Sequence, residues 1–436
     1  MDNKLGIRKW LSFLLAGFVG QLAWAIENNY LNLYVFFTSP ENAVNTFIPL
    51  MTALSAVTAT ITTLFMGALS DRLGKRKLFI SLGYIIWGIS IILFAFLDPT
   101  NNITLVIGNN AAFVAGAMIV IMDCIMTFFG STANDAAFNA YVTDNTNPTN
   151  RGKVEAVLSV LPLFAMIVIV VLGGMFVDNG RWDLFFYVFG GVTSVIGAIC
   201  LFLYPKENLQ PNKEEPYMLN IVHGFRPKVV KENKKLYLAL ISFMVFNIAI
   251  QVFMPYLMVY ITYSINVDFT ITVAVVIVSA SIITVLLGAF MDKIGKNKII
   301  FPALGAAVLG GVLMTFLTDQ IGVIIACTIL MAGYLVSTAV LGAKVRDYTP
   351  ANQAGLFQGV RMVFVVMIPM VTGPYIGLGA SSINPNTYIN DYGQEVTRPS
   401  SLVFLFTAIV LLFVLIPLII LIRKEKADES KEPAAE

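Results

Sequence analysis

Long apolar runs alternate with short polar turns along almost the whole chain of 436 residues. Most runs hold about 20 or more residues, the length that an α-helix needs to cross the hydrocarbon core of a bilayer. They lack the apolar–polar alternation of barrel strands, the other structure that a bilayer admits. The pattern therefore predicts an all-α polytopic membrane protein. Its twelve predicted transmembrane helices span residues 11–37, 44–69, 78–97, a long fourth helix ending near 142, then 154–177, 184–204, 236–263, 268–290, 299–317, 321–343, 356–378 and 401–422.

A stretch of mixed charge near the middle of the chain, rich in proline, interrupts the apolar pattern. Such a stretch is typical of a linker between domains. We therefore predict an N-terminal six-helix bundle at 1–204, a cytoplasmic linker at 205–235, a C-terminal six-helix bundle at 236–422 and a cytoplasmic tail at 423–436.

Two short basic turns stand at matching places in the two halves. Gly67–Lys77 reads GALSDRLGKRK, and Gly288–Lys298 reads GAFMDKIGKNK. A second pair of related turns, Thr143–Val157 and Arg346–Val360, follows the fourth predicted helix of each half. Matching turns at matching places indicate an internally duplicated membrane unit.

The first basic turn follows the pattern G-x-L-x-D-R-x-G-K/R-R/K, which resembles the loop between helices 2 and 3 of the major facilitator superfamily. The second turn resembles the loop between helices 8 and 9, with Lys293 and Asn297 where that pattern prefers arginine. The resemblance implies two six-helix bundles that rock around a site near the bilayer midplane. We expect Asp71 and Arg72 to act as a cytoplasmic gate, in which Asp71 pairs with a neighbouring arginine or a helix N-terminus when that side is shut and is released when it opens.

Composition excludes several classes of protein. Hydrophobic residues make up 57% of the chain and charged residues 12%, against about 25% charged residues in soluble domains. A net charge of +2 gives no sign of nucleic-acid binding, and the three cysteines lie inside apolar runs, which indicates neither a disulfide framework nor a metal site. Hydrolase, metalloprotease and phosphate-loop motifs are missing from the sequence. We therefore expect no enzyme, no catalytic residue and no cofactor.

The distribution of lysine and arginine predicts the orientation. Of 28 such residues, Arg181 and Arg398 fall in loops assigned to the outside, Arg361 falls in a predicted helix, and the others fall on the inside. Positive residues concentrate in cytoplasmic loops, so both termini are expected in the cytoplasm. We expect a multi-pass protein of the cell (plasma or inner) membrane, whose partners are the lipid bilayer and a small solute. The superfamily resemblance implies a monomer.

Ionisable side chains inside the predicted helices are candidates for function, because each costs about 2.5–3.5 kcal/mol to insert. They are Glu27, Asp123, Asp135 and Arg361. A rise of 1.5 Å per residue places the two aspartates about 18 Å apart along one helix, so they belong to different sites. We expect Asp135 to be functional and Asp123 to contact the outer vestibule.

The first predicted helix carries a polar stripe beside its carboxylate. Gln21, Trp24 and Asn28 recur at helical spacing, Asn32 lies one turn further, and Glu27 lies next to them. An aromatic ring beside amides and a carboxylate suits a sugar, whose ring face stacks while its hydroxyls take the polar groups. The alternative is that the amides join neighbouring helices.

The fourth predicted helix and the turn after it carry a more specific resemblance. Asp135-Ala-Ala-Phe138, followed by Asp144 and the basic pair Arg151 and Lys153, resembles the glycoside–pentoside–hexuronide:cation symporters, the melibiose-permease group, and the related proton-coupled sucrose transporters.

That resemblance implies that carboxylates of the first and fourth helices, here Glu27 and Asp135, hold the sugar hydroxyls. The stacking tryptophan of the family falls at Asn139, so we expect Trp24 to supply the aromatic ring. In this family a cation lies near the position of Arg361, which is expected to offset Asp135 when a proton leaves. Snorkelling to the headgroups is the alternative role for this arginine.

In the second half, Asn247 and Gln251 lie on the predicted helix at 236–263 and are candidate partners for substrate hydroxyls. Polar contacts between helices explain both residues equally well.

The composition of the second predicted helix bears on the coupling ion. Sodium-using members of the family carry acidic residues there, whereas this chain reads TATITTLFMG. A hard cation needs several oxygen ligands, some of them charged, so we expect the coupling ion to be H⁺, carried by Asp135 or Glu27, with Na⁺ as the alternative.

The sequence therefore predicts a secondary active transporter that imports a glycoside or oligosaccharide together with a proton, by alternating access. The alternatives are a proton-coupled efflux antiporter of amphipathic solutes, a sodium-coupled sugar symporter, and a sensor that transports nothing.

Overall fold

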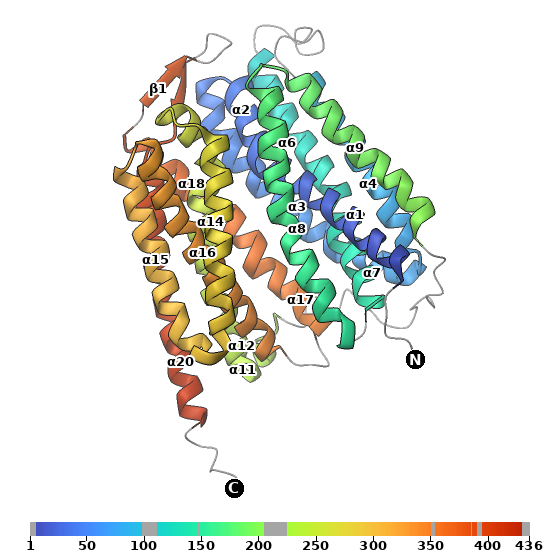
Figure 1. Cartoon of the computed structure of the whole chain (residues 1–436), viewed down its shortest axis with the longest axis vertical. Helices are drawn as coiled ribbons and strands as arrows, with labels where there is room; N and C mark the ends of the chain where they lie inside the picture. The colour runs from blue at the N-terminus through green and yellow to red at the C-terminus, as the bar shows by residue number, and fades with distance from the viewer. Residues whose placement is uncertain are drawn as a thin grey trace. The chain divides into compact units, whose positions relative to one another are not determined.

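The computed structural model describes residues 6–97, 111–146, 148–204, 225–349, 354–384, 386–389 and 395–429. The chain divides into two compact units, Met1–Glu215 with Tyr388–Thr397, and Pro216–Thr387 with Arg398–Glu436. The units are almost entirely helical (Figure 1).

The N-terminal unit begins with a long interrupted helix and continues with five further apolar segments. Its elements are α1 (Ile7–Ala25), η1 (Ile26–Leu31), α2 (Asn32–Thr38), α3 (Glu41–Leu73), α4 (Arg76–Leu93), η2 (Phe94–Phe96), α6 (Ala111–Gly130), η3 (Ser131–Phe138), α7 (Asn139–Asp144), α8 (Pro148–Val177) and α9 (Trp182–Leu203).

The C-terminal unit follows the same plan after a short helix. Its helices are α11 (Pro227–Glu232), α12 (Lys234–Phe253), η4 (Met254–Tyr256), α13 (Leu257–Val259), η5 (Tyr260–Ser264), α14 (Phe269–Ile294), α15 (Lys296–Phe316), α16 (Gln320–Tyr348), α17 (Ala354–Met362), η7 (Val363–Met367), α18 (Ile368–Ser382), α19 (Leu402–Phe413) and α20 (Leu415–Glu429).

The predicted fold class is confirmed. In the described residues, ten helices are long and apolar enough to cross a membrane, and two shorter apolar helices, Leu161–Val177 and Phe269–Thr284, stand where the fifth and eighth spans are predicted. One feature is absent from the prediction. The strands β1 (Asn386–Ile389) and β2 (Glu395–Arg398) pair in the last loop before α19.

The two units repeat one packing scheme. Within the N-terminal unit α1 packs on α8, α3 on α6, and α4 on α9; within the C-terminal unit the equivalent pairs are α12 with α18, α14 with α16, and α15 with α19. The same neighbours in the same order show that the duplicated turns mark a duplicated fold.

Glycine allows the closest of these contacts. A Cβ atom at Gly88 of α4 would lie 2.4 Å from the carbonyl oxygen of Gly190 on α9, and one at Gly197 of α9 would lie 2.7 Å from the backbone nitrogen of Ile85. Small residues at helix crossings let two backbones approach closely in a membrane. The paired helices α4 and α9 run side by side in Figure 1.

The glycines of the two basic turns have a separate role. Gly74 follows α3 with φ of 60°, and Gly295 precedes α15 with φ of 93°. A backbone in this region strains any residue with a Cβ, and glycine adopts it readily. These glycines therefore end one helix and turn the chain into the next.

The helices extend further than predicted at several ends. Helix α8 begins at Pro148 rather than at 154, and α16 continues to Tyr348. Helix α20 reaches Glu429, so part of the predicted tail is helical. The additional helical turns consist of polar residues. A search for apolar runs therefore does not find them.

Candidate substrate and coupling site

In the part of the chain that the structure describes, four helical segments are π-helical, which a 3.6-residue period does not reveal. They are η1, η3, η5 and η7. Two of them carry the predicted carboxylates, because Glu27 lies in η1 and Asp135 in η3. Isolated π-helical turns occur frequently at functional sites.

Glu27 is held by a chain of hydroxyl groups. Its side chain is 6% exposed. The Ser55 hydroxyl of α3 donates to Glu27 Oε1 at 2.5 Å, and the Ser55 and Thr127 hydroxyl oxygens lie 2.9 Å apart. The proton of Ser55 is engaged with Glu27, so Thr127 of α6 donates to Ser55. Elements η1, α3 and α6 therefore meet in one buried polar cluster.

Asp123 is a member of this cluster. It lies one helical turn before Thr127 on α6, which places both side chains on one face. Its side chain is fully buried, and neither carboxylate oxygen has a hydrogen-bond partner among the described residues. The charges of Asp123 and Glu27 lie close enough to interact. The structure encloses Asp123 among helices of the N-terminal unit, which the sequence does not predict, because helical spacing gives depth along the axis but not enclosure.

Asp135 lies near Glu27 within the same unit. It is half-buried, and the Ser131 hydroxyl donates to its Oδ2 at 3.0 Å. Its charge also interacts with that of Glu27. The fold thus brings together the two carboxylates that the sequence selects, although 108 residues separate them in the chain, between positions 27 and 135.

Asn32 departs from the predicted stripe on the first helix. Asn28 is exposed and Asn32 is buried, because the π-helical turn η1 lies between Trp24 and Asn32 and changes the rotation per residue. The amide of Asn28 donates to the carbonyl of Trp24 at 2.8 Å, and that of Asn32 to the carbonyl of Asn28 at 2.9 Å. These amides therefore satisfy backbone carbonyls around the π-helical turn.

Two tryptophan rings lie against each other in the same unit. Trp24 is half-buried, and its ring centroid lies 4.9 Å from that of the buried Trp87 on α4. Gln21, one turn earlier, is also half-buried. Asn139 is exposed, and its amide donates to the backbone carbonyl of Asp135 at 3.1 Å.

In the C-terminal unit, the predicted hydroxyl partners make contacts between helices. The amide of Asn247 on α12 donates to the carbonyl of Val365 in η7 at 2.8 Å. Gln251 is half-buried and packs closely on Gly373. A Cβ atom added to Gly373 would lie 2.4 Å from the Cβ atom of Gln251. Arg361 is half-buried and forms no ion pair with the described residues.

The side chains of Asp71 and Arg72 lie outside the part of the chain that the structure describes. A neighbouring ion pair is described. The Arg76 guanidinium at the start of α4 donates to Asp144 Oδ2 at 2.5 Å and to the Ser70 hydroxyl at 3.3 Å. Arg76 therefore ties the end of α3 and the end of α7 to α4.

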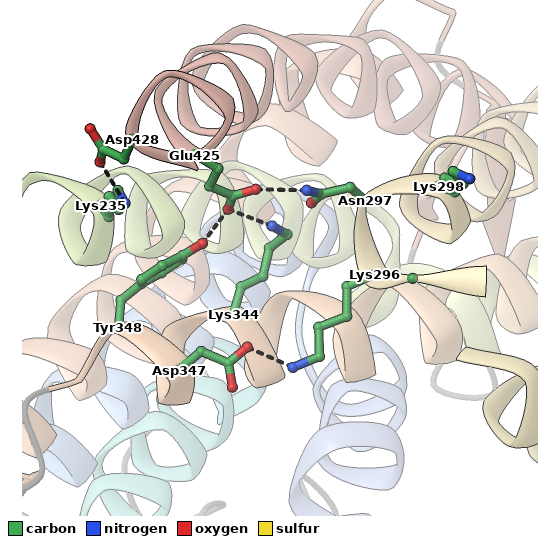
Figure 2. Close-up of a pocket in the computed structure, with 10 residues that line it drawn as sticks. Lys235, Lys296, Asn297, Lys298, Lys344, Asp347, Tyr348, Glu425 and Asp428 are labelled. Carbon is green, nitrogen blue, oxygen red and sulfur yellow. Dashed lines mark hydrogen bonds and ion pairs between the residues drawn. The ribbon is translucent and has the colours of Figure 1, made fainter. Parts of the chain in front are cut away.

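The C-terminal unit has a related and larger cluster around a cavity of about 510 Å³. Lys296 at the start of α15 pairs with Asp347 of α16 at 2.6 Å. Figure 2 shows Glu425 of α20 accepting hydrogen bonds from Lys344, Asn297 and Tyr348. Lys344 and Glu425 lie just beyond the ends of predicted helices. Charged residues are common at such positions, so the sequence does not indicate that these two are buried and paired.

Two bundles of repeated packing, with apolar helices of membrane-spanning length and, among the described residues, buried carboxylates without an ion-pair partner in one bundle, define a multi-pass membrane transporter rather than an enzyme. The family model described as Major Facilitator Superfamily matches residues 10–374, and the chain belongs to that superfamily.

Solved structures show the same fold at low sequence identity. A point mutant of the nucleoside transporter NupG superposes with a TM-score of 0.69 at 11% identity, covering 94% of this chain and 99% of that one. The xylose transporter XylE from E. coli, in a partially occluded inward-open conformation, gives 0.65 at 15% identity, covering 93% and 97%. The search of curated proteins found no match.

Proposed function

We propose that this transporter imports a glycoside together with a proton. The observation that carries the proposal is the pair of carboxylates Glu27 and Asp135, both on π-helical turns of one unit and close enough for their charges to interact. A carboxylate kept inside a membrane protein at a cost of several kcal/mol marks a substrate or proton pathway.

The chemistry around these carboxylates favours a sugar. Trp24 offers a partly accessible ring, Gln21 offers a polar group one helical turn before it, and the same unit holds the half-buried Asp135. NupG is described as a nucleoside transporter and XylE as a xylose transporter, and the ligands of both contain a sugar ring. Together with the motif around Asp135, this supports a place in or near the glycoside–pentoside–hexuronide:cation symporter group.

The remaining features of the proposal follow from charge. The lysine and arginine distribution supports a cytoplasmic location of both termini, and we assign the protein to the cell membrane as a monomer. Asp71 and Arg72 form the cytoplasmic gate, and Arg361 offsets the charge of Asp135. Export of an amphipathic solute is the second candidate, and the concentration of carboxylates and amides beside Trp24 favours a sugar over it.

Cells that express the protein test the proposal in weakly buffered medium. Adding a transported sugar from a panel of sucrose, melibiose, xylose and uridine should make the medium alkaline, because a proton enters with the solute. Uptake should collapse in Glu27→Gln and Asp135→Asn. Asp183→Asn, on an exposed aspartate paired with Arg181, is the matched control and should transport normally. Wild-type uptake rates in both site variants would refute the assignment.

A further inference from the structure

The buried cluster in the N-terminal unit holds more acid than its surroundings can neutralise. Among the described residues neither Glu27 nor Asp123 forms an ion pair with a lysine or arginine. Three of their four carboxylate oxygens, Glu27 Oε2 and both of Asp123, have no hydrogen-bond partner there. Among the residues that the structure describes, the other titratable groups that interact with the pair are Asp135 and Cys124, neither of which supplies positive charge.

Two adjacent negative charges in such an enclosure are unfavourable, because each buried unpaired ion costs several kcal/mol and like charges repel. One negative charge is tolerable, because the Ser55 hydroxyl donates to Glu27 and is itself supported by the Thr127 hydroxyl, which donates to Ser55. While it is enclosed, the pair therefore carries one charge and retains one proton. Water can relieve this requirement only when the site opens.

We propose that Glu27 and Asp123 together hold the coupling proton, while Asp135, about three turns further along the same helix, contacts the substrate. This proposal rests on the proposed function and changes one assignment in it: the coupling proton is assigned to the buried pair and not to Asp135.

A charge count gives the decisive variant. The enclosed wild-type pair has one charge and one proton. In Asp123→Asn, Glu27 is the remaining carboxylate of the pair, and because the enclosure tolerates one charge, Glu27 can stay ionised and the pair then holds no proton. The variant should therefore still carry sugar across the membrane but without coupling to the proton gradient. Asp135→Asn should lose substrate binding and with it every mode of transport.

Proteoliposomes separate the two modes. Accumulation of labelled sugar driven by a pH gradient should fall at least tenfold in Asp123→Asn, while counterflow between equal pH values should stay within about twofold of wild type; in Asp135→Asn both should be lost. Asp123→Glu, which restores a carboxyl, should recover part of the accumulation, and Asp183→Asn should match wild type. Full pH-driven accumulation in Asp123→Asn, or loss of its counterflow, overturns the proposal.

Wild-type protein provides a second test that needs no variant. Dicyclohexylcarbodiimide modifies protonated carboxyls in apolar surroundings, so mass spectrometry should find it on Glu27 or Asp123, with less label at higher pH. Absence of label on both residues also overturns the proposal. Absence of any wild-type uptake of the sugar panel would instead refute the proposed function, and accumulation driven by a sodium gradient would refute both.

Discussion

Buried charges in the two units have opposite surroundings. In the C-terminal unit, the side chains of Lys344 and Glu425 are 4% and 9% exposed and form an ion pair of 2.7 Å, with Asn297 and Tyr348 completing the hydrogen bonds of the carboxylate. In the N-terminal unit, Glu27 and Asp123 are equally buried, yet no cation among the described residues pairs with them.

The difference separates structural charges from functional ones. A buried carboxylate with every acceptor satisfied holds helices in place, and it has no reason to bind a further ion. A buried carboxylate with open acceptors is stable only if something else supplies the missing proton or hydrogen bond. Among the described residues, the duplicated fold therefore has unpaired buried carboxylates in one copy and a fully paired buried carboxylate in the other.

The largest effect is expected from breaking the satisfied cluster. Lys344→Met leaves Glu425 buried without its cation, and removing one partner of a buried pair costs about 3–5 kcal/mol. The apparent melting temperature of the purified protein in detergent should therefore fall clearly. The control is Lys298→Met, because Lys298 lines the same cavity but is exposed. Equal melting temperatures for the two variants would show that the Lys344–Glu425 pair does not hold α16 to α20.

A smaller effect is expected from the hydroxyl that supports Glu27. Ser55→Ala removes a donor to a carboxylate, and hydrogen bonds to charged groups contribute about 1.5–3 kcal/mol. Release of the proton should become harder because the ionised pair loses this support, so initial rates of pH-driven uptake should fall roughly tenfold.

Ser90→Ala is the matched control for that variant. Ser90 is also a buried serine in a membrane helix, but its hydroxyl donates to the carbonyl of Trp87 on its own helix at 2.6 Å. Its uptake should stay near the wild-type rate. If both alanine variants were equally slow, the loss would reflect general packing of polar groups between helices and not support of Glu27.

Hydropathy and the repeated turns are enough to predict the fold. Apolar runs give the membrane helices because a bilayer leaves the backbone so few choices. The ends of the helices are less predictable: α16 and α20 continue past the hydrocarbon layer, and the polar residues there resemble a loop. The strand pair β1–β2 escapes prediction because its residues have no apolar alternation to mark them.

The candidate site is predictable as a set of residues and not as an arrangement. The cost of burying acids selects Glu27 and Asp135, but the turn η1 alters the spacing that groups Trp24 with Asn32. The enclosure of Asp123 depends on α3 packing against α6. Such a contact between distant segments leaves no periodic trace in the sequence.

The smallest effect is expected at an ion pair that occurs once in each unit. Each unit joins a basic residue of its duplicated turn to the aspartate at the end of the fourth helix, Arg76 to Asp144 and Lys296 to Asp347. The first pair has side chains 11% and 27% exposed, and the second 34% and 51%. Exposed pairs contribute about 0–1 kcal/mol because water and side-chain entropy offset the attraction, whereas an arginine also donates along a rigid planar fork.

We therefore expect Arg76→Gln to lower the melting temperature more than Lys296→Gln, by a difference of about 1–2 kcal/mol in unfolding free energy. Raising the salt concentration should weaken the Lys296 pair more than the Arg76 pair, because ions screen exposed charges most. A larger loss from Lys296→Gln would mean that burial does not decide which charges matter in this fold. The contrast between the two units would then have to be explained by position in the repeat instead of by access to water.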